Sequence, residues 1–136
     1  MASRVESQGF SLLEVLLVLA LMAVLSGLAL PFWQAQQYPA KRQLAWLQLQ
    51  QLLLVQLEHH MQAGVYLGDL TALTNEAGRL GYDYELQLTD DGLWLQAIVQ
   101  ASGPQSGDQQ CWQLWLHETG RRQAFDRLGN QTLACD

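Results

Sequence analysis

The sequence is poor in several features that large enzymes and nucleic-acid-binding proteins need. It has only 7 Lys and Arg against 13 Asp and Glu, which gives a formal net charge of −6 at pH 7. This balance argues against non-specific binding of nucleic acid through its phosphates, so we expect no nucleic-acid partner. The chain has only two cysteines. Its length of 136 residues suits about one domain. It is too short for a large cofactor-binding enzyme.

Charge is almost absent from one long segment near the N-terminus. Between residues 12 and 30 only Glu14, Ser26 and Gly27 are not aliphatic, Ala or Met. A helix over residues 10–33 covers about 36 Å, which exceeds the hydrocarbon core of a bilayer. We therefore expect residues 10–33 to form a transmembrane helix.

The single carboxylate in this segment separates three interpretations. A cleaved secretory signal is disfavoured, because Glu6 offsets Arg4 and the apolar run exceeds the usual 7 to 15 residues. A plain signal anchor explains the length but not Glu14, since a carboxylate inside a membrane costs about 2.5–3.5 kcal/mol even on mild scales. Glu14 then either lies at the headgroup boundary or has a function.

The flank of the segment carries a more specific signal. It reads Gly9-Phe10-Ser11-Leu12-Leu13-Glu14-Val15. This sequence resembles the N-terminal signal of type IV prepilins and type II secretion pseudopilins, with Ser11 where Thr is commoner. The resemblance implies that residues 1–9 are a leader peptide. It also implies that a prepilin peptidase cuts after Gly9 on the cytoplasmic side and methylates the new amine of Phe10.

The same resemblance implies how the chain would assemble. Glu14 would face the Phe10 amine of a neighbouring subunit, so one charge pair in a low dielectric would set the register. Pro31 matches a proline that loosens such helices, or it marks the membrane exit. The implied partners are other pilins or pseudopilins and an inner-membrane assembly platform. The chain would cross the inner membrane once, with a cytoplasmic N-terminus and a periplasmic C-terminal domain, and would be extracellular in an assembled pilus.

Residues 34–136 are expected to form that globular domain, beginning with a helix over 34–63 that is interrupted at Pro39. We expect Gly64 to end this helix and residues 64–81 to form a surface loop with a short helix at 69–73. Side chains at fourfold spacing predict the face of the helix that covers a sheet. These are Leu49, Leu53, Leu57 and Met61, with Trp46 near the same face.

Strand signals follow over residues 82–125. Alternating apolar residues in 84–88, a Thr89-Asp90-Asp91-Gly92 turn and the apolar run 93–99 predict a hairpin. Residues 111–118 and 121–125 are expected to be further strands joined by a turn at Thr119-Gly120. The predicted fold class is α+β and type IV pilin-like, with a long N-terminal helix, membrane-spanning in its first half, on a three- or four-stranded antiparallel sheet.

Cys111 and Cys135 are the only cysteines. Because the resemblance places this domain in the oxidising periplasm, we expect a disulfide rather than a metal site. On the loop-entropy model it would contribute roughly 3 to 3.5 kcal/mol. A disulfide-bounded C-terminal region, here residues 111–135, is frequent in pilins of the pilus and missing from many secretion pseudopilins. It favours a type IV pilus minor pilin over a pseudopilin.

Two possible metal sites are disfavoured. His59 and His60 are adjacent and point about 100° apart on a helix, so they lack the spacing of zinc ligands. Some pseudopilins hold calcium in a loop of the sheet, and four acidic residues raise that possibility here. Asp-Asp-Gly is first of all a turn, however, and the spacing fits no EF-hand. The four are Asp83, Glu85, Asp90 and Asp91.

Arg121, Arg122 and Arg127 form a basic cluster inside the loop between the cysteines, and some minor pilins take up DNA through basic stripes. Against the net charge of −6, a solvated mixed surface is the preferred interpretation, and a DNA-binding or adhesive pilus subunit is the minority one. The sequence contains no readable nucleophile–base set or phosphate-binding loop, so we expect no enzyme activity and no cofactor.

Overall fold

The computed structural model describes residues 11–70, 73–74 and 77–135, and within these it leaves out the side chains of 28–32, 34–35 and 77–78. The chain divides into two compact units, Met1–Gln36 and Gln37–Asp136. Helix α1, Leu12–Ala63, contributes to both. It includes Pro39, so the predicted interruption there is wrong. A proline removes one backbone hydrogen bond of the helix, and the bonds on either side persist.

The first unit consists of the N-terminal part of α1, and its described side chains are almost all apolar and exposed. Within the described part of the chain, no helix is both long enough and apolar enough to cross a membrane. The span expected over residues 10–33 stays a prediction.

The second unit contains a four-stranded antiparallel sheet with the strand order β1-β2-β3-β4. Its strands are β1 (Tyr82–Thr89), β2 (Gly92–Val99), β3 (Gln113–His117) and β4 (Arg122–Phe125). The predicted α+β class and antiparallel sheet are confirmed. Gly92 has a φ of +128° at the end of the β1–β2 turn, a conformation that favours glycine. Strands β1 and β2 pair on either side of this turn, as the predicted hairpin requires.

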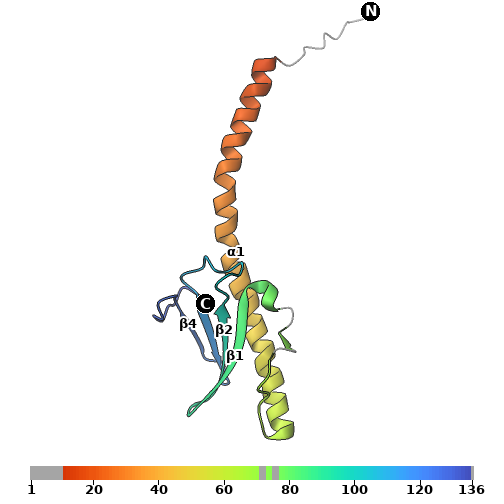
Figure 1. Cartoon of the computed structure of the whole chain (residues 1–136), viewed down its shortest axis with the longest axis vertical. Helices are drawn as coiled ribbons and strands as arrows, with labels where there is room; N and C mark the ends of the chain where they lie inside the picture. The colour runs from red at the N-terminus through yellow and green to blue at the C-terminus, as the bar shows by residue number, and fades with distance from the viewer. Residues whose placement is uncertain (1–10, 71–72, 75–76, 136) are drawn as a thin grey trace, which may run out of the picture. The chain divides into compact units, whose positions relative to one another are not determined.

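One face of this sheet packs on the second half of α1 (Figure 1). The alternation of β2 sends its odd-numbered residues from Leu93 to Val99 into the core. The helix supplies apolar side chains at three- and four-residue intervals, which share one face. The central members of the core are Ala45, Trp46, Leu49, Leu52, Leu53, Leu93, Leu95, Ala97, Leu114 and Leu116.

Two sequence predictions about this packing are wrong. Met61 was expected on the buried face, but it is 80% exposed. Four residues rotate the helix by about 400°, so a strict fourfold stripe drifts by about 40° per step and has left the core after three steps from Leu49. The loop over 64–81 was expected to be surface, yet Leu70 is buried in the core.

The loop after α1 begins at Gly64, whose φ is +74°. A 3-10 helix, η2 (Ala77–Leu80), precedes β1. The short helix expected at 69–73 lies partly outside the described residues. In the described part, the amide of Leu73 donates to the carbonyl of Leu70 over 3.0 Å, which is one tight turn.

Candidate functional site

The N-terminal part of α1 exposes a row of large apolar side chains. Leu12, Leu13 and Leu25 are 80%, 76% and 66% exposed, and the aliphatic side chains between them are exposed as well. A water-facing helical surface of this kind is unusual in a soluble monomer and marks a region that another apolar surface covers.

Glu14 lies in the first turn of this helix. The Ser11 carbonyl accepts hydrogen bonds from the amides of Glu14 (2.9 Å) and Val15 (3.2 Å), so the helix begins just before the carboxylate. A negative charge is favourable at this end of a helix. Glu14 also borders a shallow depression of about 340 Å³ whose other lining residues share one helical face. They are Val15, Val18, Leu19 and Met22.

This arrangement can receive an apolar helix that brings a cation to the carboxylate. The predicted processing residues Gly9 and Phe10 lie outside the described residues, as does the side chain of Pro31. Helix α1 includes position 31 in its backbone. The roles predicted for these three residues stay predictions.

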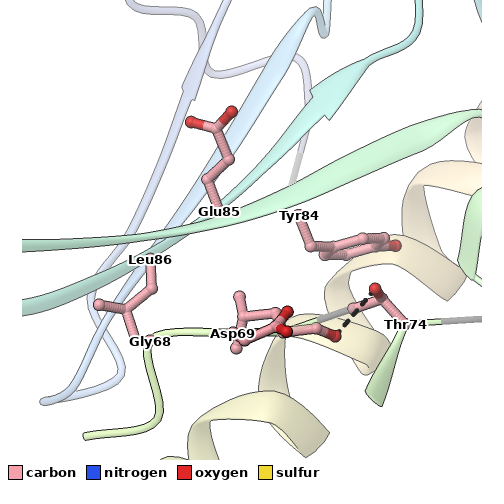
Figure 2. Close-up of a pocket in the computed structure, with 7 residues that line it drawn as sticks. Gly68, Asp69, Thr74, Tyr84, Glu85 and Leu86 are labelled. Atoms are coloured by element: carbon pink, nitrogen blue, oxygen red, sulfur yellow. Dashed lines mark hydrogen bonds between the residues drawn. The ribbon is translucent and has the colours of Figure 1, made fainter. Parts of the chain in front are cut away.

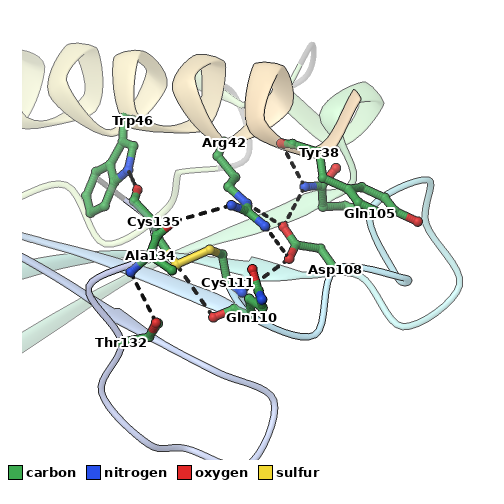
Figure 3. The surroundings of a disulfide bond; sticks show 10 residues. All are labelled: Tyr38, Arg42, Trp46, Gln105, Asp108, Gln110, Cys111, Thr132, Ala134 and Cys135. Atoms are coloured by element: carbon green, nitrogen blue, oxygen red, sulfur yellow. Dashed lines mark hydrogen bonds and ion pairs between the residues drawn. A yellow bond between two sulfur atoms is a disulfide. The ribbon is translucent and has the colours of Figure 1, made fainter. Parts of the chain in front are cut away.

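In the second unit, a disulfide joins Cys111 and Cys135 with a Cα–Cα distance of 5.8 Å (Figure 3). Both residues are buried in the core. The indole Nε1 of Trp46 donates to the carbonyl of Cys135 over 2.9 Å. The C-terminal end of the chain is thereby fastened both to the segment before β3 and to helix α1.

A buried ion pair lies beside the disulfide (Figure 3). Arg42 donates to both carboxylate oxygens of Asp108 over 2.7 Å, and Asp108 is only 2% exposed. The carboxylate also accepts from Gln105 Nε2 (3.0 Å) and from the amide of Cys111 (3.2 Å). Its acceptor positions are therefore well filled, as a buried charge requires.

Gln105 extends this network to the start of the second unit. Its Nε2 also donates to the carbonyl of Tyr38 over 3.2 Å. Burial raises the pKa of Tyr82 well above its ordinary value, and the Asp108 carboxylate adds to that rise. Tyr82 therefore stays protonated across the physiological range. The network holds this stretch of α1 against the loop that precedes β3.

Sequence reasoning identified both cysteines and Trp46 but missed Arg42 and Asp108. A signal for them was present. Arg42 lies four residues before Trp46 and so on the face predicted to be buried, where a cation needs a partner. Asp108 is the only acidic residue between positions 101 and 110.

The three arginines of the predicted basic cluster each lie over a different tryptophan. Arg121 lies 4.9 Å from the Trp94 ring, Arg122 lies 5.0 Å from the Trp46 ring and Arg127 lies 4.9 Å from the Trp112 ring. Arg121 also donates to Asp91 over 2.8 Å. Each of the three guanidinium groups therefore packs on its own indole ring, and the three do not form one continuous basic groove.

The acidic residues considered for calcium are engaged elsewhere or stand apart. Hydrogen bonds from Thr89 and Trp94, assisted by Arg121, lower the pKa of Asp91 to about 2. Asp83 accepts from Gln100 over 2.7 Å. No group of three or more potential metal ligands occurs among the residues that the structure describes.

The two histidines near the end of α1 contact the loop that follows it. Nδ1 of His59 lies 2.8 Å from the carbonyl oxygen of Val65. The His60 ring stacks on Tyr66 with 4.2 Å between the centroids. These contacts fasten the helix end to the chain after it.

One further depression, of about 320 Å³, lies between this loop and β1 (Figure 2). Among its lining residues, Thr74 donates to the carbonyl of Leu70 over 3.0 Å. Burial raises the pKa of Tyr84, which also lines it. The other lining residues are Gly68, Asp69, Glu85 and Leu86.

Residues 6–30 match the family model described as the prokaryotic N-terminal methylation motif, which is the signal of type IV pilins and pseudopilins. The match includes Gly9, Phe10 and Glu14 and ends within the first unit of the structure. No curated protein and no solved structure is significantly similar to the chain.

Proposed function

We propose, from the premise that the chain carries a prokaryotic N-terminal methylation motif, that it is a minor pilin of a type IV pilus. The motif supports a type IV pilin-like or pseudopilin protein. The observation that carries the proposal is the motif over residues 6–30, in which Glu14 stands in the first turn of a helix with exposed apolar side chains.

The first step of the proposed function is processing. A prepilin peptidase cuts between Gly9 and Phe10 and methylates the amine of Phe10. Residues 10–33 hold the chain in the inner membrane, with the leader in the cytoplasm and the domain in the periplasm. An inner-membrane assembly platform then transfers the subunit into the filament.

The second step is packing among other pilin-type helices. Neighbouring N-terminal helices cover the exposed leucines of α1, and the Phe10 amine of one subunit meets Glu14 of the next. Away from water such a pair is strengthened, and an unpaired carboxylate is costly. The charge pair therefore selects one axial register among many that would bury similar apolar area.

The alternative is a pseudopilin of a type II secretion system, since the motif is common to both machines. The disulfide between Cys111 and Cys135 supports the pilus, because it closes a C-terminal region of the kind that pilins often carry. The arginines that would support DNA capture lie over separate tryptophans, so we do not propose DNA binding.

Intact-mass measurement tests the proposal. The full chain is expressed with an active prepilin peptidase and, as the control, with an inactive one. We expect loss of residues 1–9 and a gain of about 14 Da on Phe10 only with the active enzyme. An unprocessed chain, or one cut near Pro31, would overturn the proposal.

A second measurement separates the two machines. The processed chain is sought by mass spectrometry in sheared, purified pili and in an isolated secretion pseudopilus from the same cells. Its presence in pili, lost when the pilus platform is deleted, supports the minor pilin. Its presence only with the secretion machinery would replace that assignment by the pseudopilin.

A further inference from the structure

The two edges of the sheet differ in what covers them. The strand order leaves β1 and β4 outermost (Figure 1). The segment after β4 folds back on that strand, since Phe125 pairs with Gln131 and the amide of Thr132 also bonds to β4. No other strand of the described chain pairs with the outer side of β1. The sheet therefore has one open edge, and an open edge is a template for a further strand.

The hydrogen bonds of β2 show which backbone groups of β1 point outward. Successive residues of a strand in an antiparallel sheet bond alternately to the neighbour on one side and to the neighbour on the other. The carbonyl of Leu93 and the amide of Val99 each bond towards the β3 side over 2.9 Å. The odd-numbered residues of β2 therefore bond to β3. Their partners in β1 include Tyr84, Leu86 and Leu88, which direct their N–H and C=O groups away from the sheet.

None of these outward backbone groups meets a hydrogen-bond partner in the part of the chain that the structure describes. A depression of about 320 Å³ lies beside them, between β1 and the loop after α1 (Figure 2). The side chains of Tyr84 and Leu86 point to the loop side of the strand, and Glu85 points to the opposite side. Leu88 shares the side of Leu86 by alternation and is 61% exposed. One side of the open edge is thus apolar.

The other side of the open edge is acidic. Residues 82–91 contain four carboxylates and no Lys or Arg. Asp83 accepts a hydrogen bond from Gln100, and Asp91 is paired with Arg121. The carboxylate of Glu85 is exposed and has no hydrogen bond or ion pair within the described residues. A strand laid along β1 would place its side chains about 4.5–5.5 Å from those opposite, so a cation there would meet this carboxylate.

We propose that the open β1 edge binds an extended segment of a different protein in which Lys or Arg alternates with aliphatic residues. The backbone of that segment pairs with the outward groups of β1, as in other complexes formed by strand addition. Its cations share the side of Glu85, and its aliphatic side chains pack beside Leu86 and Leu88. None of the four described strands carries two cations at alternate positions, so a second copy of the sheet does not supply this partner.

The proposal goes beyond the proposed function, because it depends on the sheet and not on the machine that the chain serves. It also fits a rare subunit that joins unlike proteins. The partner is defined by its chemistry: an extended backbone, alternate cations and alternate aliphatic side chains. A carboxylate at the position of a cation would meet Glu85 and be rejected.

Binding of a designed peptide to the full chain in non-ionic detergent tests the proposal. The probe is a fluorescent, end-capped peptide of the sequence Lys-Val-Lys-Val-Lys-Val, and fluorescence anisotropy follows its binding. We expect saturable binding that protects the amides of Tyr84, Leu86 and Leu88 from hydrogen exchange. The amides of Glu85 and Gln87 already face β2, so their exchange should change less. No binding, or protection confined to other segments, would overturn the proposal.

Two control peptides separate strand pairing from simple attraction to an acidic protein. The peptide Lys-Lys-Lys-Val-Val-Val has the same composition but no alternation. The probe with methyl groups on all its backbone nitrogens keeps its charge but has lost its backbone donors. Each should bind at least about tenfold more weakly, because several hydrogen bonds or side-chain contacts are lost together. Equal binding of all three peptides would show that charge alone attracts them, and the proposal would fail.

Charge reversal on the protein provides a matched comparison. Glu85→Lys should weaken binding of the probe by about fivefold or more, because it replaces an attraction by a repulsion. Glu58→Lys makes the same change of net charge on the exposed side of α1 and should bind as the wild type does. Equal weakening by the two substitutions would contradict binding at the β1 edge.

A proline at the edge tests the backbone directly. Leu88→Pro removes an outward amide and leaves the bonds between β1 and β2 in place, whereas Leu88→Ala keeps that amide. Leu88→Pro should bind the probe more weakly than Leu88→Ala, and the reverse order would count against strand pairing. Near-ultraviolet circular dichroism checks that both variants are folded. If Leu88→Pro is not folded, the methylated peptide still decides, since it is measured on the wild-type chain.

Processing after Gly9 is recorded by intact mass as a separate result. A processed chain that does not bind the probe contradicts the strand-addition site and leaves the proposed function standing. A chain that binds the probe at β1 but is never processed contradicts the proposed function and leaves the site standing.

Discussion

Arg42 and Asp108 lie 66 positions apart in the sequence, yet the guanidinium group of one meets the carboxylate of the other through two hydrogen bonds of 2.7 Å. The pair joins helix α1 to the loop before β3, beside the disulfide. Asp108 is almost fully buried, so water contributes little to stabilising its charge. Each charge is stabilised mainly by its partner.

Replacing Asp108 by Asn should therefore destabilise the domain strongly. The change leaves the Arg42 cation buried without a counter-charge, and breaking such a pair typically costs about 3–5 kcal/mol. Unfolding of the full chain in detergent, followed by near-ultraviolet circular dichroism, measures the loss. Asp90→Asn, at an exposed turn, should change stability by less than about 0.5 kcal/mol. Equal effects of the two substitutions would contradict this account of the pair.

Asp91 should make stability depend on pH in the acid range. Its carboxyl has a pKa of about 2 in the folded chain against an ordinary value of 3.8. Because the folded pKa is the lower one, its stabilising contribution is complete above about pH 4 and is lost as the pH falls towards about 2. Melting temperatures from pH 6 to 2 should fall less steeply for Asp91→Asn than for the wild type or Asp90→Asn. Parallel curves for all three proteins would argue against this role.

The disulfide should contribute a large share of the stability of the domain. The two cysteines are 24 positions apart, and a loop of that size is worth about 3.5 kcal/mol on the entropy model. The Cys111→Ser, Cys135→Ser double variant should lose about that amount and should release the Trp46 indole from the Cys135 carbonyl. Urea unfolding and the near-ultraviolet signal of tryptophan measure the two effects. Unchanged stability would show that the loop is held by its other contacts alone.

Gly107 should tolerate a side chain only if Tyr38 is changed as well. A Cβ at position 107 would overlap the Tyr38 hydroxyl and lie 3.1 Å from its Cζ. Gly107→Ala should cost about 1–3 kcal/mol through this overlap. The cost should be smaller in a Tyr38→Phe background, which removes the overlapping oxygen. A double-mutant cycle with zero coupling would contradict the close approach.

The features that were predictable from the sequence are those with a local pattern. The turn around Gly92 and the alternation of β2 predicted the hairpin, and the spacing of Trp46 and Leu49 predicted the buried face of α1. Met61 was assigned wrongly because the assumed fourfold stripe is slightly out of phase with the helix. Each correct prediction depended on residues that are close together in the sequence.

The contacts that were missed join distant segments. Nothing local to Arg42 or Asp108 specifies that the other will be its partner, and only the assembled core brings them together. Leu70 was predicted to be on the surface because its neighbours are typical of a loop, whereas it fills space left beside α1. The N-terminal motif was recognisable because its residues lie in one short linear segment, so its pattern does not depend on contacts between distant parts of the chain.

Glu14 should matter for assembly and not for processing. Glu14→Ala removes the only carboxylate of the apolar segment, so membrane insertion should not suffer, and the cut after Gly9 should proceed as in the wild type. Without the charge that selects the register, incorporation into pili should fall by at least about tenfold, since an unmatched Phe10 amine would be left away from water. Intact mass of the membrane-bound chain and immunoblotting of sheared pili measure the two steps separately.

Two control variants test whether the charge of Glu14 is what matters. Glu14→Asp keeps the charge and should retain more incorporation than Glu14→Ala, while Ser26→Ala, in the same helix, should behave as the wild type. If Glu14→Ala chains enter pili at the wild-type level, the carboxylate does not set the register, and the exposed leucines of α1 alone must direct the packing.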